Sequence, residues 1–194
     1  MCAIDVPCSC APGIPEGPLR ALSDVSCKLF DALSDLHGFS ESDCRLMSRA
    51  VCGLRLMRSG DRISAGELLV FHLTLADLEP HDAWVVETAA CYATERAADR
   101  EIEGEGRATL NDHTRALWFG ALLRLSGGLG CLSPGDAPTA VFAVWTDDLI
   151  FIEFDGGALM DYQIRSARSR VTALELLVGR RALLARSSAR RVIA

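Results

Sequence analysis

Apolar residues in the first two thirds of the chain recur at steps of three and four, the spacing of one face of an α-helix. The first such run begins at Leu19 and ends before Gly38, a residue suited to a left-handed C-terminal cap. The second opens at Ser40 and Asp43, which have the spacing of a capping box, and continues to Met57. The pattern therefore predicts two consecutive helices in this part of the chain.

Three further helices are expected before the pattern changes. One covers residues 65–77. The next begins at Pro80, which suits the first turn of a helix, and runs towards Arg100. The last opens at Thr109 and Asp112, again with capping-box spacing, and continues until a Gly-rich stretch. The first part of the chain is therefore expected to be entirely helical.

The last third of the chain has a different pattern. The Gly/Pro-rich stretch "SGGLGCLSPGDAP" ends the helical part. Two β-branched and aromatic runs, "AVFAVWT" and "LIFIEF", are joined by Asp147 and Asp148, which predicts a hairpin. A helical pattern then covers residues 159–178, and "RRALLA" indicates a last short strand. The expected fold is mainly α-helical with a small C-terminal α/β appendage of order β-β-α-β.

These changes of pattern divide the chain into four segments. Residues 1–17 hold three prolines, two glycines and three cysteines, and we expect a flexible leader there. A helical domain is expected over residues 18–132, a small α/β subdomain over 137–187 and a tail over 188–194. A chain of 194 residues is long enough for one domain with such an appendage.

The composition is that of an ordinary globular protein, with 49% apolar and 24% charged residues. The longest uninterrupted apolar runs are only a few residues, far short of the roughly 20 that a membrane-spanning helix needs. The sequence does not start with a basic segment followed by an apolar one, so no signal peptide is expected. We therefore expect a cytoplasmic protein without a membrane partner.

Eight cysteines need an explanation, because such a number suggests a metal site or disulfides. No C-x-x-C spacing occurs, and pairs of that motif are what build a tetrahedral zinc site. Most of the cysteines fall in apolar helical patterns, where a free thiol acts as a small apolar side chain. The "CSC" near the N-terminus leaves a soft-metal or oxidation role open. We expect no resident cofactor; the cysteines are Cys2, Cys8, Cys10, Cys27, Cys44, Cys52, Cys91 and Cys131.

Charge is uneven along the chain. The whole sequence has a net charge of −6, yet residues 165–191 hold eight arginines and one acid, Glu175. Arginine binds phosphate and carboxylate through its planar fork, so this segment is a candidate for binding a polyanion such as polyphosphate. A solvated helix face is the alternative interpretation, and the lack of interleaved aromatic residues argues against nucleic acid. The candidate polyanion-binding residues are Arg165, Arg168, Arg170, Arg180 and Arg181.

Several segments together resemble one known family. "CKLFDALSDLHGFSESDCRLMSRAV" is similar to a segment in the C-terminal region of the exopolyphosphatase/guanosine pentaphosphate phosphatase family. "RALWFGALLRLSGGLG" resembles a later helix of that region, and "VFAVWTDDLIFIEF" with "GRRALL" resembles its closing β/α unit. The order and spacing of these segments carry the resemblance over most of residues 20–185. It implies a helical domain similar to the HD superfamily of metal-dependent phosphohydrolases.

The resemblance also implies that the metal ligands of an active HD domain are missing. The family's histidine–aspartate pair falls within "AVCGLRLM", at Leu54 and Arg55. Apolar side chains offer a metal no donor, and an arginine repels a divalent cation. Tyr92 retains the family's tyrosine. The remaining ligand positions are occupied by Glu67, Ala93, Gly128 and Gly130.

Two functions stay open. The first is a non-catalytic binding or regulatory module whose partner is a second copy, a phosphatase or polyphosphate. The second is a phosphohydrolase acting on polyphosphate or guanosine pentaphosphate, or an accessory subunit of one. Its rearranged site would draw on Glu67, His72, Asp77 and His81.

For the His81–Asp82 dipeptide we expect capping, because an aspartate at a helix start complements the helix dipole. The family's Gly-rich phosphate-binding turns do not occur in this sequence. We therefore assign no catalytic or metal-binding residue.

Overall fold

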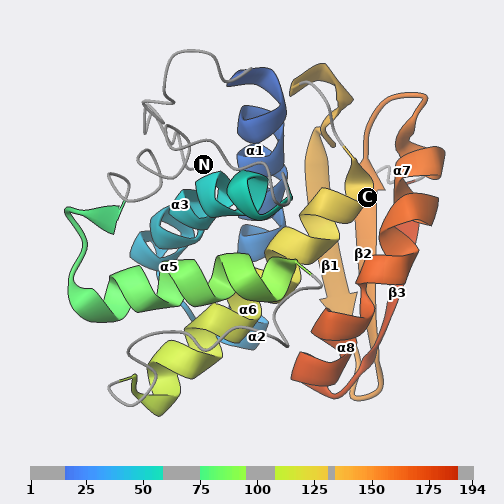
Figure 1. Ribbon diagram of the computed structural model, residues 1–194. Helices are drawn as coiled ribbons and strands as arrows, with labels where there is room; N and C mark the ends of the chain where they lie inside the picture. The colour runs from blue at the N-terminus through green and yellow to red at the C-terminus, as the bar shows by residue number, and fades with distance from the viewer. Residues whose placement is uncertain (1–15, 59–74, 95–107, 131–133, 188–194) are drawn as a thin grey trace.

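The computed structural model describes residues 16–58, 75–94, 108–130 and 134–187 (Figure 1). The described part is mainly helical and ends in a small three-stranded sheet with its own helices, so the predicted fold class is confirmed. The leader, the tail and most of the predicted helix over residues 65–77 lie outside the described residues. The helices of the first part are α1 (Glu16–Ala32), α2 (Ser34–His37), α3 (Glu41–Arg58), α5 (Pro80–Ala93) and α6 (Leu110–Leu129).

Local capping signals set most of the helix boundaries. Gly38 adopts a left-handed conformation with φ of 68° and its N–H donates to the Ser34 carbonyl, which ends α2. The backbone N–H of Ser40 donates to Asp43 at 3.0 Å, ahead of α3. Thr109 and Asp112 form a reciprocal capping box at the start of α6. The predicted cap at Gly38 and the predicted box at Thr109–Asp112 are confirmed, and the predicted box at Ser40–Asp43 is confirmed for the bond that Asp43 accepts.

Two boundaries differ from the prediction. The first predicted helix is interrupted at Leu33, which separates α1 from α2. The helix that starts at Pro80 ends at Ala93 instead of continuing towards Arg100. Thr94 leaves the helical conformation, and its hydroxyl donates to the Cys91 carbonyl at 2.9 Å. A hydroxyl that satisfies a terminal carbonyl in this way competes with further helix formation.

The centre of the helical part is apolar on nearly every side. α5 packs along α6 and against α3, and α1 packs on α3 and α6 (Figure 1). Most of α5 is buried, and Phe119, Leu122 and Leu123 of α6 are fully buried. A helix that is apolar all round belongs in an interior, so α5 and α6 form the middle of the molecule.

The C-terminal unit is built on a hairpin and a parallel strand. β1 (Ala140–Trp145) pairs antiparallel with β2 (Leu149–Asp155), and β2 pairs parallel with β3 (Arg181–Arg186). The predicted hairpin and β-β-α-β order are confirmed. The single helix predicted over residues 159–178 is in fact two helices with a 3-10 turn between them. These elements, with a preceding 3-10 turn, are η4 (Pro134–Asp136), α7 (Met160–Ala167), η5 (Arg168–Arg170) and α8 (Thr172–Val178).

One continuous core joins the two parts. Ile150, Ile152 and Phe154 of β2 are fully buried in the same cluster as the helices of the first part. α1 contacts β1, and α6 contacts α7 and α8. Lys28 of α1 also donates to the Pro138 carbonyl at 2.8 Å, just before β1. None of the helices in the described ranges is long and apolar enough to cross a bilayer.

Candidate functional site

Two of the positions at which the resemblance implies lost metal ligands lie in the apolar core. Leu54 of α3 is 1% exposed and Ala93 of α5 is 5% exposed. Arg55 is part of α3, although its side chain is not described, and Glu67 lies outside the described residues. Two of the implied ligand positions are therefore ordinary core positions, with no donor atom on the side chain.

Gly128 and Gly130 of "SGGLG" have backbone roles. A Cβ on Gly128 would lie 2.9 Å from the Ala167 Cα and 2.9 Å from Cγ of Arg170, so α6 approaches the α7–η5 junction too closely for a side chain. Gly130 has φ of 65° and forms the left-handed cap of α6. An acidic side chain at position 128 would therefore push α6 away from the α7–η5 junction. The sequence alone does not reveal this contact.

The rearranged site of the alternative hypothesis is only partly within the described residues, because Glu67 and His72 are not. The two remaining members bind different partners. Asp77 accepts from Arg49, with 3.0 Å between Nη2 and Oδ2, and Nδ1 of His81 is 3.0 Å from Oδ2 of Asp112. In the part of the chain that the structure describes, no three His, Cys, Asp or Glu side chains are grouped so that they could hold a metal ion.

Sequence analysis missed an arginine that joins three helix starts. Arg115 of α6 donates to Asp43 of α3 at 2.8 Å and to Asp82 of α5 at 2.9 Å. Its guanidinium also lies 3.7 Å from Asp112. Each aspartate is in the first turn of its helix, where a negative charge complements the helix dipole. We call Arg115 and these three aspartates the arginine clamp.

The electrostatics of the clamp favour ionised carboxylates. Burial alone would raise the pKa of Asp43, but hydrogen bonds from Ser40 and the charge of Arg115 outweigh burial and the pKa is lowered. Burial likewise opposes ionisation of Asp112, while hydrogen bonds from Thr109 and the contact with His81 lower its pKa. Asp43 and Asp112 thus already have hydrogen-bond and ion-pair partners within the protein.

The described cysteines are thiols and not disulfides, and three of them are buried: Cys27, Cys44 and Cys91. Cys27 of α1 lies 3.3 Å from the Ser48 hydroxyl of α3. Hydrogen bonding with Cys44 lowers the pKa of Cys27 in spite of burial. The expectation of buried thiols is confirmed for these three, while Cys2, Cys8, Cys10 and Cys131 lie outside the described residues.

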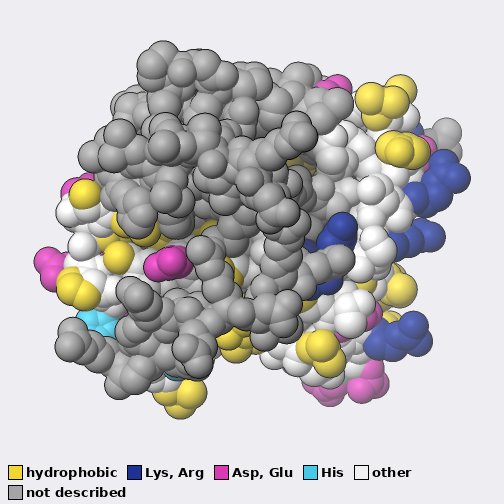
Figure 2. All heavy atoms as spheres, in the orientation of Figure 1, with side chains coloured by type: hydrophobic (Ala, Val, Ile, Leu, Met, Phe, Trp, Pro, Cys, Tyr) yellow, Lys and Arg dark blue, Asp and Glu magenta, His cyan; other side chains and the backbone are white. Residues whose placement is uncertain are grey.

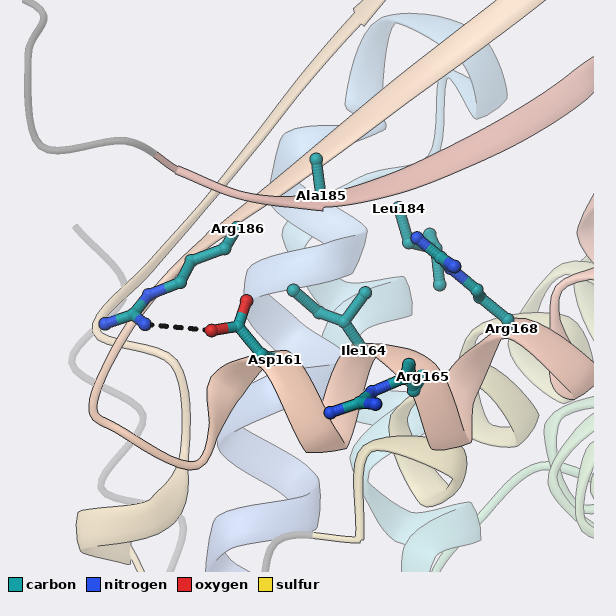
Figure 3. Close-up of a pocket in the computed structure, with 7 residues that line it drawn as sticks. All are labelled: Asp161, Ile164, Arg165, Arg168, Leu184, Ala185 and Arg186. Atoms are coloured by element: carbon teal, nitrogen blue, oxygen red, sulfur yellow. Dashed lines mark hydrogen bonds and ion pairs between the residues drawn. The ribbon is translucent and has the colours of Figure 1, made fainter.

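Arginine is frequent in the C-terminal unit, with eight residues between positions 165 and 191. In Figure 2 the Lys and Arg side chains gather at the right, where Figure 1 places α7 and α8. A groove of about 550 Å³ lies there between α7 and β3 (Figure 3). We call it the arginine groove; it is lined by Asp161, Ile164, Arg165, Arg168, Leu184, Ala185 and Arg186.

The charges in the arginine groove are not balanced. Arg186 pairs with Asp161 at 3.1 Å, and this is the dashed contact of Figure 3. Arg165 and Arg168 are exposed, and neither has an ion pair or hydrogen bond with another described residue. They are three residues apart on α7 and η5, so they lie on one side of the helix. Two uncompensated guanidinium groups therefore face solvent in an open groove with Ile164 and Leu184 in its wall.

The five arginines named from the sequence do not form one surface. Arg165 and Arg168 line the groove. Arg170 packs against Gly128 of α6, and Arg180 donates to the Asp147 carbonyl at 3.1 Å in the hairpin. Arg181 begins β3, at the strand end opposite Arg186. The groove residue that sequence reasoning missed is Arg186, because only the fold brings the end of β3 beside the first turn of α7.

Comparison with known proteins adds no family to these observations. No protein-family model and no curated protein matches this sequence. The likeness to exopolyphosphatase-type C-terminal regions therefore stays a prediction, and evidence on function has to come from the side-chain chemistry of this chain.

Proposed function

We propose that this chain is a non-catalytic binding module that takes a polyanion, with polyphosphate as the leading candidate, in the arginine groove. The observation that carries the proposal is the pair of exposed guanidinium groups of Arg165 and Arg168 in a groove whose single carboxylate is already paired. Support also comes from the helical interior. Leu54 and Ala93 place apolar side chains where an HD phosphohydrolase would carry ligands, and the three acids of the clamp are already paired with Arg115.

The groove suits the chemistry of a phosphate chain. Its volume is within the range of about 300–1,000 Å³ that is typical of small-ligand sites. An arginine can donate two parallel hydrogen bonds to one phosphate, and such charge-assisted bonds are among the strong ones in water. Because Arg165 and Arg168 follow each other along one helix side, they can hold successive phosphate groups of an extended anion.

Titration with polyphosphate tests the proposal. The variant Arg165→Ser/Arg168→Ser should bind a polyphosphate of defined length at least tenfold more weakly than the wild type. The matched control Arg20→Gln/Arg45→Gln removes the same charge from exposed sites of α1 and α3 and should change affinity less than threefold. Affinity for the wild type should fall as salt rises, because released counterions drive part of the binding. Equal losses in both variants, or no binding at low salt, would show that the groove is not the site.

The alternative, a hydrolase of polyphosphate or guanosine pentaphosphate, is favoured by one contact. His81 is half exposed and lies 3.0 Å from Asp112, the arrangement of a base and the acid that orients it. Asp112 nevertheless already accepts from the N–H and hydroxyl of Thr109, both at 2.8 Å, as expected for a cap. Phosphate release in the presence of Mg²⁺ or Mn²⁺ that disappears in His81→Ala would replace the binding proposal by the hydrolase.

A further inference from the structure

One face of the sheet is covered and the other is bare. The crossover helices α7 and α8 lie on the same side as the helical core, in front of the strands in Figure 1. That inner face holds the buried side chains of β2 and β3, such as Ile152 and Leu184. The opposite face is apolar as well, yet its large side chains are exposed by 36–51%: Phe142, Val144, Phe151 and Leu183.

The strand register shows how this bare face is arranged. Its central row is Val144, Phe151 and Leu183, which are direct neighbours across the three strands. On one side of this row lie Phe142 and Glu153, followed by Asp155. On the other side lie Leu149 and Arg181. The bare face is therefore apolar in the middle, acidic towards one end of the strands and basic towards the other.

We propose that two copies of the chain associate through this bare face. The two sheets would stack about a two-fold axis that lies between them and perpendicular to the strands. This operation reverses the strand direction, so the acidic end of one face meets the basic end of the other. Glu153 of β2 in each copy then faces the end of the second sheet at which Arg181 lies, on the neighbouring strand β3, and the apolar rows meet in the middle. A two-fold interface has to be self-complementary, and this charge order satisfies that requirement.

The size of the face predicts a weak dimer. Three strands about 4.8 Å apart and about six residues long give a face of roughly 300 Å². Stable interfaces bury about 800 Å² on each partner, so we expect a dissociation constant in the micromolar range or weaker. Exposed apolar patches of a few hundred Å² often mark interaction sites. The arginine groove lies on the helix-covered side of β3 and stays open in this dimer.

Sedimentation velocity of the full chain from about 1 to 500 µM tests the association. The wild type should shift from monomer to dimer within this range. Phe142→Glu and Leu183→Glu should each weaken association at least tenfold without a change in circular dichroism, because both side chains are already exposed. Leu176→Glu is the matched control: Leu176 is 80% exposed but belongs to α8, on the other side of the sheet, and should leave the dimer unchanged.

A charge exchange tests the predicted orientation. Glu153→Arg and Arg181→Glu should each weaken the dimer about fivefold or more, since each places like charges at the same end of the interface. The double variant Glu153→Arg/Arg181→Glu should recover affinity to within about threefold of the wild type. A double variant as weak as the single ones would overturn the antiparallel arrangement. A full chain that stays monomeric at 500 µM would overturn the proposal.

Discussion

The helical part and the C-terminal α/β unit differ in whether their arginines are paired with carboxylates. In the helical part, Arg115 is 15% exposed and its guanidinium is shared among three aspartates of three helices. In the α/β unit, Arg165 and Arg168 point away from the core without a carboxylate partner among the described residues. The first arrangement holds a fold together, and the second is available to a ligand. The contrast suggests that the helices supply a frame and that binding is a property of the appendage.

The apolar surfaces show the same difference. The helical part buries most of the residues of α5 and α6, whereas the sheet leaves Phe142 and Val144 half exposed. Buried apolar surface stabilises the fold, while an exposed apolar face can stabilise an assembly only if something covers it. Perturbations of the helical part should therefore change stability, and perturbations of the α/β surface should change binding.

The largest effect should follow from removing the guanidinium of the clamp. Arg115→Met leaves Asp43, Asp82 and Asp112 close together without their cation, and breaking a buried pair in this way costs about 3 kcal/mol of unfolding free energy. Chemical denaturation measures the change. Arg165→Met is the matched control and should stay within about 0.5 kcal/mol of the wild type. Similar losses in the two variants would remove the distinction between the structural and the available arginines.

A smaller effect is expected from the close approach of α6 to α5. In Gly120→Ala the new Cβ would lie 2.6 Å from the Tyr92 Cβ and 3.2 Å from the Ala89 carbonyl oxygen, so the two helices must separate. Overpacking of this kind costs about 2 kcal/mol, which exceeds the gain of about 1 kcal/mol that alanine brings to a helix interior. Thermal denaturation should therefore show a lower midpoint.

Gly157→Ala in the α/β unit is the control for this substitution. A Cβ at Gly157 meets no atom within 4 Å, so its midpoint should not fall. A higher midpoint for Gly120→Ala would mean that α5 and α6 can separate without cost. The helical part would then be no more tightly packed at this point than the α/β unit is at Gly157.

Local features of the fold could be predicted from the sequence, and features that need distant segments could not. The capping pairs Ser40–Asp43 and Thr109–Asp112 act within one turn, so their spacing alone places the helix starts. The Arg115 contacts span 72 and 33 residues, so no spacing rule could reveal the clamp. The sequence does show an aspartate at each of these helix starts. On its own, such an aspartate predicts only a helix cap.

The candidate site shows the same limit. Composition located the arginine-rich segment, yet spacing along the chain could not separate the groove residues Arg165 and Arg168 from Arg170, which packs on α6. Arg186 became part of the groove only because a parallel β3 returns beside the first turn of α7. Similarly, Gly128 was interpreted as a lost acid, while its place in the fold is a helix contact that excludes a side chain.

The smallest predicted effect concerns His37, in the helical part. Its ring lies among Phe30, Phe39 and Trp118, with centroids 4.2, 5.1 and 5.3 Å away. The Phe39 N–H donates to Nδ1 at 2.9 Å, so Nδ1 carries no proton and Nε2–H donates to the Phe30 carbonyl at 2.9 Å. Protonation of Nδ1 would break the first of these bonds, and burial lowers the pKa of His37 below its ordinary value.

Because the unfolded chain then binds the proton more readily than the folded one, the contribution of His37 is complete above about pH 6.5 and is lost as pH falls through the lower folded pKa. The unfolding free energy should decrease over this interval by at most about 1.4 kcal/mol per pH unit, the slope of one proton. His37→Gln should flatten that slope. All four histidines precede residue 114, so amide chemical shifts in β1, β2 and β3 should stay constant between about pH 5.5 and 7.5. Chemical-shift changes in the sheet over that interval would show that protonation in the helical part alters the α/β unit. The two parts would then not be independent.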